Sequence, residues 1–189
     1  MTFPVFVNPF VLNIILPARM KNILFRFLLL VSVCLVNIGC DQITKHYFKN
    51  RVSPGSAIHV VKDFFIITYA ENDGGFLSLG AGLPSPVKTV LLVWTPVIFI
   101  ILAFVYLFSN YVLRPSLNLF SFISLTSVIA GGVSNLADRF AHGAVFDFMV
   151  FGVSSLRTGV VNAADLSITF GAIIFAISLR KRKTEKIIN

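Results

Sequence analysis

The run Val90–Phe108 carries no charged side chain, and it restricts the fold more than any other feature of the sequence. A helix of about 20 mostly apolar residues spans the hydrocarbon core of a bilayer. Three other stretches approach the same length and apolarity, at about Ile23–Gly39, Leu117–Leu136 and Val160–Leu179. Charged residues make up only 13% of the chain, too few to cover a globule in water. We therefore predict an all-α membrane protein with four transmembrane helices.

Residues 3–17 form a further apolar stretch near the N-terminus. Pro4 and Pro9 interrupt it, and a proline-broken segment of this length is a poor membrane span. Met20 begins a more natural N-terminal sequence. We therefore interpret residues 1–19 as a dispensable extension.

The chain from Met20 onward is predicted to form one membrane domain over residues 20–183, followed by a cytoplasmic tail at 184–189. A cleaved signal peptide that ends in the lipobox-like segment Asn37–Cys40 is the alternative for the first span. The leucine expected three residues before Cys40 is absent, and this favours a first span that is retained.

Lysine and arginine residues are divided unevenly between the two ends of the predicted spans. Four spans place both termini on one side, and that side collects one acid, Glu185, and nine basic residues: Arg19, Lys21, Arg26, Arg114, Arg180, Lys181, Arg182, Lys183 and Lys186. Basic residues accumulate on the cytoplasmic side of membrane proteins. We therefore predict cytoplasmic termini and assign the net charge of +8 to topology and to anionic lipids, not to nucleic acid.

The opposite, extracytoplasmic side contains the two longest connections. Phe64–Tyr69 is aromatic and β-branched, which predicts a strand, and the following Asn72–Gly75 predicts a turn. A second strand is predicted at Ala144–Val150 in the connection before the last span.

Acids and amides gather in three blocks near this side of the last two spans: Gly131–Arg139, Gly143–Phe148 and Asn162–Asp165. Ionisable residues at a membrane boundary are costly to desolvate, so they are functional candidates. Two facing carboxyl groups, here Asp147 and Asp165, can share one proton and activate a water without a metal. The blocks therefore suggest an aspartic hydrolase that needs no cofactor.

Structural roles compete with this interpretation. Asn162 and Asp165 also have the spacing of a helix N-cap followed by an acid, a purely structural arrangement. The adjacent Asp138 and Arg139 are more readily explained as a plain ion pair than as catalytic groups.

Other candidate site residues also have alternative explanations. Asp147 lies between two phenylalanines, and it could face solvent from its strand. Asn72 could serve only to form the turn before Gly74. His142 follows Asp138 by one helical turn, but with no second histidine or cysteine nearby we expect no metal site.

Five blocks together resemble the lipoprotein signal peptidase family, also called signal peptidase II, over about residues 21–183. The blocks are Asp41–Lys45, Asn72–Gly74, Asn135–Arg139, Gly143–Phe148 and Asn162–Asp165. The resemblance implies that Asp147 and Asp165 form the catalytic pair. It implies support or substrate-binding roles for Asp41, Asn72, Gly74, Asn135, Asp138, Arg139, Asn162 and Ala164.

The resemblance further implies the fold and the substrate. The fold would be four transmembrane helices with a small extracytoplasmic β-cradle and a surface-lying helix. The substrate would be a prolipoprotein whose cysteine carries a diacylglyceryl group, cut just before that cysteine at the outer face of a bacterial cytoplasmic membrane. We expect a monomer surrounded by membrane lipids.

The sequence departs from the family pattern at two points, and two other classes of function are alternatives to the peptidase. Asp73 places an unusual negative charge beside the site, and the aromatic Phe76 comes one position earlier than in the family. A metal-dependent lipid-headgroup transferase would need acids at helical spacing, whereas a glycine-containing loop separates Asp138 from Asp147. A non-enzymatic carrier would favour acids in mid-membrane, whereas these acids cluster at one boundary.

Overall fold

The computed structural model of the chain describes residues 18–114 and 116–188. Within this part, four helices are long and apolar enough to cross a membrane: Asn22–Lys49, Ser85–Leu113, Leu119–His142 and Ala163–Arg180. The four helices and one antiparallel sheet fit the predicted membrane protein. The extension predicted at residues 1–19 lies almost entirely outside the described residues.

The first, third and fourth of these spans belong to single α-helices, whereas the second is composite. The α-helices are α2 (Ala18–Lys49), α5 (Leu119–His142) and α6 (Ala163–Ile188). The second span joins α3 (Ser85–Thr89), a π-helical segment (Val90–Trp94), α4 (Thr95–Leu107) and a second π-helical segment (Phe108–Leu113).

Two predicted helix ends are wrong, and both helices continue further. α2 was expected to end near Gly39 and α5 near Leu136, but α2 runs to Lys49 and α5 to His142. The added turns contain charged side chains that are buried against neighbouring elements, so they need not leave the helix to reach water. α5 ends where Gly143 adopts the left-handed conformation with φ of 77°, a common helix C-terminus.

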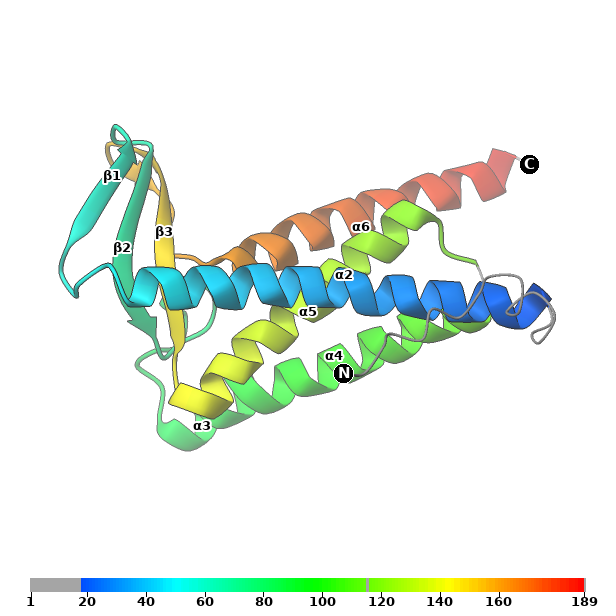
Figure 1. Cartoon of the computed structure of the whole chain (residues 1–189), viewed down its shortest axis with the longest axis horizontal. Coiled ribbons are helices and arrows are strands. Elements are labelled where there is room, and N and C mark those ends of the chain that lie inside the picture. The colour runs from blue at the N-terminus through cyan, green and yellow to red at the C-terminus, as the bar shows by residue number, and fades with distance from the viewer. Residues whose placement is uncertain (1–17, 115, 189) are drawn as a thin grey trace, which may run out of the picture.

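Helix α5 lies at the centre of the bundle and packs most extensively on α6 (Figure 1). Glycine allows the close approach at two points of this contact. A Cβ atom on Gly131 would lie 2.7 Å from the Ala164 carbonyl oxygen, and one on Gly171 would lie 2.7 Å from that of Ser124. Small residues at such contacts let two helix backbones pack in van der Waals contact.

The sheet has the order β1-β2-β3-β4 and is antiparallel throughout. Its strands are β1 (Ala57–Val61), β2 (Phe65–Asn72), β3 (Val145–Val153) and β4 (Leu156–Arg157). The strands predicted at 64–69 and 144–150 are confirmed as β2 and β3, whereas β1 and β4 were not predicted.

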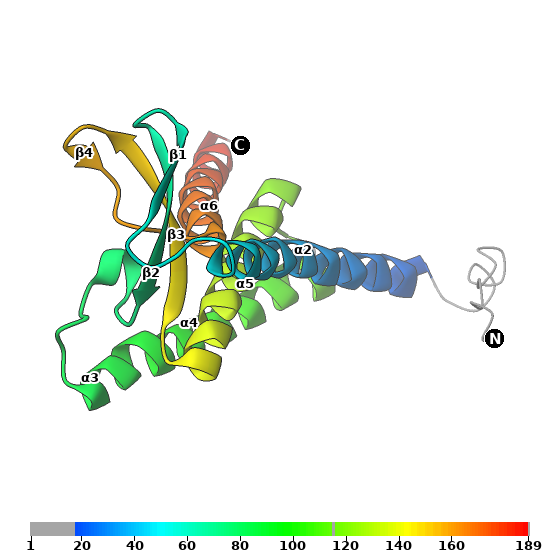
Figure 2. The ribbon, with the colours of Figure 1, turned by 60° about the vertical axis from the view of Figure 1, so that its left-hand side comes forward.

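The sheet lies at one end of the helices, where α2 and α5 end and α6 begins (Figures 1 and 2). The start of α2 and the end of α6 lie at the opposite end of the bundle (Figure 1). The sheet is fixed to the helices by an isolated bridge between Met149 and Val161, which holds the segment before α6 against β3. The sheet thereby determines where the first turn of α6 is placed.

The connection between β2 and α3 contains one short helix in the described residues, a 3-10 turn at Phe76–Ser78. Leu77 and Ser78 both adopt positive φ values, 55° and 60°, so the backbone of this turn departs from right-handed helical geometry.

Candidate active site

Asp147 is almost fully enclosed, with 1% of its surface exposed, whereas Asp165 is 9% exposed. It lies on β3 between two amide groups: Asn72 donates to its Oδ2 at 2.8 Å, and Asn162 donates to its Oδ1 at 2.6 Å. Burial raises the pKa of Asp147 from 3.8 to about 6, opposed by the Asn72 hydrogen bond and assisted by the charge of Asp165. The group can therefore change its charge near neutral pH.

Asp165 lies in the first turn of α6 and forms a capping box with Asn162. The backbone N–H of Asp165 donates to Asn162 Oδ1 at 2.9 Å, and the backbone N–H of Asn162 donates to Asp165 Oδ2 at 3.2 Å. Asn135 on α5 donates to the other oxygen, Oδ1, at 2.9 Å. The helix N-terminus favours negative charge at this position.

Two asparagines connect the two acids. Asn162 contacts Asp147 through its side chain and Asp165 through its backbone, and its Nδ2 also donates to Asn135 Oδ1 at 3.2 Å. Asn135 in turn donates to Asp165. The structural explanation of Asn162 as a helix cap is therefore correct, but it is incomplete, because the same side chain also contacts Asp147.

Both carboxyl groups line one cavity of about 360 Å³. Asn72, Asn135 and Arg139 add polar groups to its wall. Its apolar wall comes from the second, third and fourth spans and from β3, through Leu92, Pro96, Leu136, Val145 and Ile168. The cavity thus combines two carboxyl groups with a largely apolar wall, as is typical of ligand sites.

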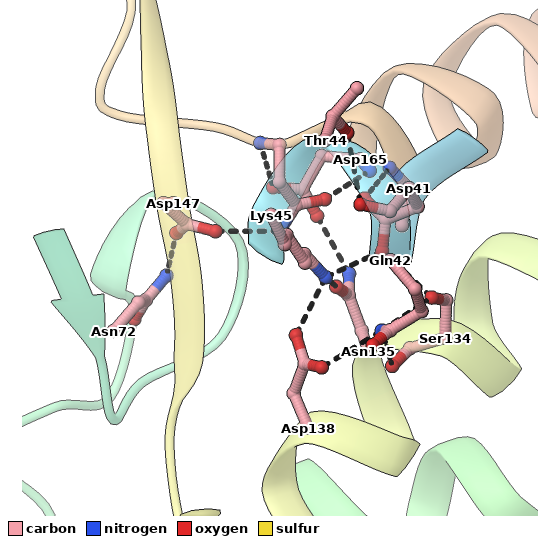
Figure 3. A network of polar contacts seen from close by, with 12 residues as sticks. Asp41, Gln42, Thr44, Lys45, Asn72, Ser134, Asn135, Asp138, Asp147 and Asp165 are labelled. Atoms are coloured by element: carbon pink, nitrogen blue, oxygen red, sulfur yellow. Dashed lines mark hydrogen bonds and ion pairs between the residues drawn. The ribbon is translucent and has the colours of Figure 1, made fainter. Parts of the chain in front are cut away.

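Behind the pair lies a buried charge cluster centred on Lys45 of α2 (Figure 3). The Lys45 ammonium lies 2.6 Å from Asp41 Oδ2, 2.7 Å from Asp138 Oδ2 and 2.9 Å from Asn135 Oδ1. Asp41 also accepts hydrogen bonds from the Ser134 hydroxyl at 2.7 Å and the backbone N–H of Ala164 at 2.8 Å. This cluster ties α2, α5 and the first turn of α6 together.

The loop after β2 approaches the same cavity from the sheet. The backbone N–H of Gly74 donates to Asn72 Oδ1 at 2.9 Å, and Arg139 donates to the Gly74 carbonyl at 2.8 Å. A Cβ atom on Gly74 would lie 2.8 Å from the backbone of Ser78, so a larger residue does not fit. Asn72 therefore forms the expected turn and also binds Asp147.

Residues 33–181 match the family described as signal peptidase (SPase) II. The chain belongs to this family. Membership makes it a protease and a multi-pass protein of the bacterial inner membrane, and it supports removal of signal peptides from prolipoproteins as the activity.

Individual relatives agree with the family match. The chain is 30% identical to a protein of Syntrophus aciditrophicus named lipoprotein signal peptidase, and the alignment covers 88% of this chain and 99% of the relative. Two further relatives have the same name. In Clostridium novyi the identity is 31%, covering 79% of this chain and 95% of the relative. In Staphylococcus aureus it is also 31%, covering 77% and 84%.

Two solved structures described as a bacterial membrane enzyme are similar to this signal peptidase II chain. Each is 25% identical, and the TM-scores are 0.69 and 0.64. The first similarity covers 83% of this chain and 90% of the other, and the second covers 79% and 91%.

All ten site residues predicted from sequence meet in one network. One detail of that prediction is wrong: Asp138 and Arg139 do not pair with each other, because Asp138 contacts Lys45 and Arg139 contacts the Gly74 carbonyl. Three members were missed, namely Lys45, Gln42 and Ser134. The helical spacing of Asp41 and Lys45 was the available signal for the lysine, because residues four apart share one helix face.

The unusual Asp73 has a partner of its own. Its carboxylate lies 2.5 Å from the Lys88 ammonium, and this exposed pair joins the loop to α3. Hydrogen bonding and the charge of Lys88 lower the pKa of Asp73, so it stays ionised. Its negative charge is therefore neutralised locally on the outer side of the loop.

Proposed function

We propose that this signal peptidase II protein is an aspartic endopeptidase in which Asp147 and Asp165 are the catalytic pair. The observation that carries the proposal is the connection of the two carboxyl groups through Asn162 at the wall of one cavity. The surrounding asparagines donate to the carboxylates, so an ionised form is stabilised even though it is buried.

The reaction follows from sharing one proton between the two acids. Asp165, at the helix N-terminus, is the ionised member, and its carboxylate takes a proton from a water whose oxygen attacks the scissile carbonyl carbon. Asp147 is the protonated member and donates a hydrogen bond to the carbonyl oxygen as negative charge develops there. When the C–N bond breaks, the leaving amine takes up a proton from the pair, which returns to its starting state.

We assign the substrate as a prolipoprotein whose cysteine carries a diacylglyceryl group, with the cut immediately before that cysteine. The lining of the cavity supports this assignment, because it combines the two carboxyl groups with Leu92, Pro96 and Ile168 from membrane-spanning helices. A peptide would lie against the carboxyl groups while its lipid chains remain in an apolar environment.

We place the sheet and the acids at the extracytoplasmic face and both termini in the cytoplasm. The charge distribution supports this orientation, since the end of the bundle away from the sheet holds the basic N-terminal flank and the basic end of α6. We also propose that the enzyme works as a monomer among membrane lipids.

Cleavage of a lipidated precursor by the purified protein in lipid nanodiscs tests the proposal. Asp147→Asn and Asp165→Asn should each abolish cleavage while the protein still accumulates in membranes. Asp63→Asn is the matched control, because this acid is exposed and far from the network, and it should cleave normally. Near-normal turnover by either site variant would rule out the pair.

Two further measurements distinguish this peptidase activity from other activities. Mass spectrometry of the product should find the modified cysteine at the new N-terminus, and a precursor without the lipid should be cut poorly. A chelator should leave cleavage unchanged, whereas a metal-dependent lipid-headgroup transferase would be inhibited by it.

A further inference from the structure

Lys45 is an unusual residue for its position, because only 4% of its surface is exposed. A buried ammonium group is costly unless it is paired and hydrogen-bonded. Here three oxygens surround it at 2.6–2.9 Å, two from the carboxylates of Asp41 and Asp138 and one from the Asn135 side chain. Two carboxylates are enough to neutralise one lysine, so the contact with Asn135 calls for a separate explanation.

That third contact fixes the orientation of the Asn135 amide, together with Asn162 Nδ2, which donates to the same oxygen at 3.2 Å. A lysine ammonium can only donate hydrogen bonds, so the atom of Asn135 that faces it must be the oxygen. The NH₂ group is then forced to the other side, where it donates to Asp165 Oδ1 at 2.9 Å. With the amide reversed, its NH₂ would face the ammonium, and its oxygen would face a carboxylate.

Lys45 also places a positive charge directly behind the two acids. Only the Asn135 amide separates the ammonium from Asp165, and the positive charge acts to lower the pKa of Asp147. Arg139 lines the cavity of the pair, whereas Lys45 lines a second cavity behind it. Lys45 therefore acts on the pair without touching a substrate.

We propose that Lys45 is a positioning residue of this active site, which sets the Asn135 amide toward Asp165 and keeps one negative charge on the catalytic pair. This inference rests on the proposed aspartic mechanism. It predicts two separable effects of removing the ammonium, a loss of rate and a displacement of the pH–rate profile.

The charged groups around Lys45 determine how the profile must be measured. Asp41 and Asp138 contact it, and the acids of the pair lie beyond Asn135. A second cavity of about 190 Å³ behind Lys45 is lined by further titratable groups: His46, Lys49, Glu71 and His142. The profile should therefore also be recorded in a His46→Gln, His142→Gln background, so that neither imidazole near Lys45 contributes to it.

The test is the pH dependence of kcat/KM for a lipidated precursor with Lys45→Met. We expect kcat/KM to fall on the order of 100-fold, as for a small misplacement of a reacting group. We also expect the profile to move to higher pH by about one unit, because a nearby cation favours the ionised carboxyl. Lys45→Arg keeps the charge and should keep the profile at its wild-type position.

Lys49→Met is the matched control, because it removes the same charge one helical turn further on, where the ammonium is partly exposed and 3.5 Å from Glu71. Its profile should not move, since exposed charges are screened. If Lys45→Met loses activity while its profile stays at the wild-type position, the lysine is merely structural, and the inference is overturned.

Asp138→Asn decides the question if Lys45→Met fails to accumulate. This variant retains Lys45 with Asp41 and Asn135 and removes one negative charge, so its profile should move to lower pH. No movement, or movement to higher pH, would refute the inference. Failure of the aspartic mechanism itself gives a different result, namely activity in Asp147→Asn or Asp165→Asn.

Discussion

Asp147→Asn should remove activity and also change how the stability of the protein depends on pH. The folded protein holds the pKa of Asp147 at about 6, whereas the ordinary value is 3.8. In the unfolded chain the carboxyl loses its proton near its ordinary pKa, but in the folded protein it keeps the proton to about pH 6. The wild-type protein therefore becomes less stable as pH rises through this window.

The size of the effect follows from the difference in pKa. About two pH units at about 1.4 kcal/mol each correspond to about 3 kcal/mol of unfolding free energy lost between pH 4 and pH 7.5. Asparagine has the same shape and does not titrate, so the variant lacks this loss. For a chain of this length, the difference corresponds to roughly 6–12 °C in Tm.

The assay is thermal unfolding of both proteins in the same detergent, monitored by the fluorescence of the single tryptophan, Trp94. The informative quantity is the Tm of the variant minus that of the wild type, taken at pH 4 and again at pH 7.5. Subtraction removes the titration of the other acids, and the constant cost of placing an asparagine amide opposite Asn72 and Asn162 also cancels. An equal difference at the two pH values would refute the reasoning.

Three further outcomes are expected. Gly131→Ala should lower activity more than tenfold and destabilise the fold by about 1–3 kcal/mol, because its Cβ would lie 2.7 Å from the Ala164 carbonyl and displace the first turn of α6. Gly39→Ala is the control in the cleavage assay and in thermal unfolding, because Gly39 has open space around it. Lys88→Met breaks an exposed ion pair and should change kcat/KM less than about fivefold, in the cleavage assay described above. Deleting residues 2–19 should leave cleavage intact, and loss of activity with normal membrane insertion would contradict that expectation.

The spans were predictable because lipid imposes a simple requirement on long apolar runs, and Val90–Phe108 satisfies it without ambiguity. The helix ends were not predictable by the same rule. Hydropathy falls at Asp41 and again at Asp138, which suggested that each span had already ended or nearly so. Both helices continue because these acids are buried beside Lys45, a tertiary contact that no local pattern encodes.

The candidate pair was predictable from the family-like blocks, whereas the contacts that hold it were not. Asp138 and Arg139 are adjacent in sequence, which favoured a mutual ion pair. On a helix, neighbouring residues point in directions about 100° apart, so the two side chains reach different partners. The missed Ser134 shows the same limit, because its hydroxyl contacts Asp41 from a distant part of the chain.

The direction of the Asp147 side chain is determined by its aromatic neighbours. Phe148 stacks on Phe48 with 4.8 Å between ring centroids, and Phe146 contacts Tyr69 at 4.9 Å. Alternation along β3 then turns Asp147 to the opposite face, toward the catalytic cavity. A slip of one residue would exchange the faces and would place a carboxyl among the aromatic rings.

Burial of each phenylalanine stabilises the observed register by about 1.5–3 kcal/mol, and the slipped register would also bury a charge without a partner. The two phenylalanines that flank Asp147 in the sequence are therefore the reason that its carboxyl faces the cavity and not solvent.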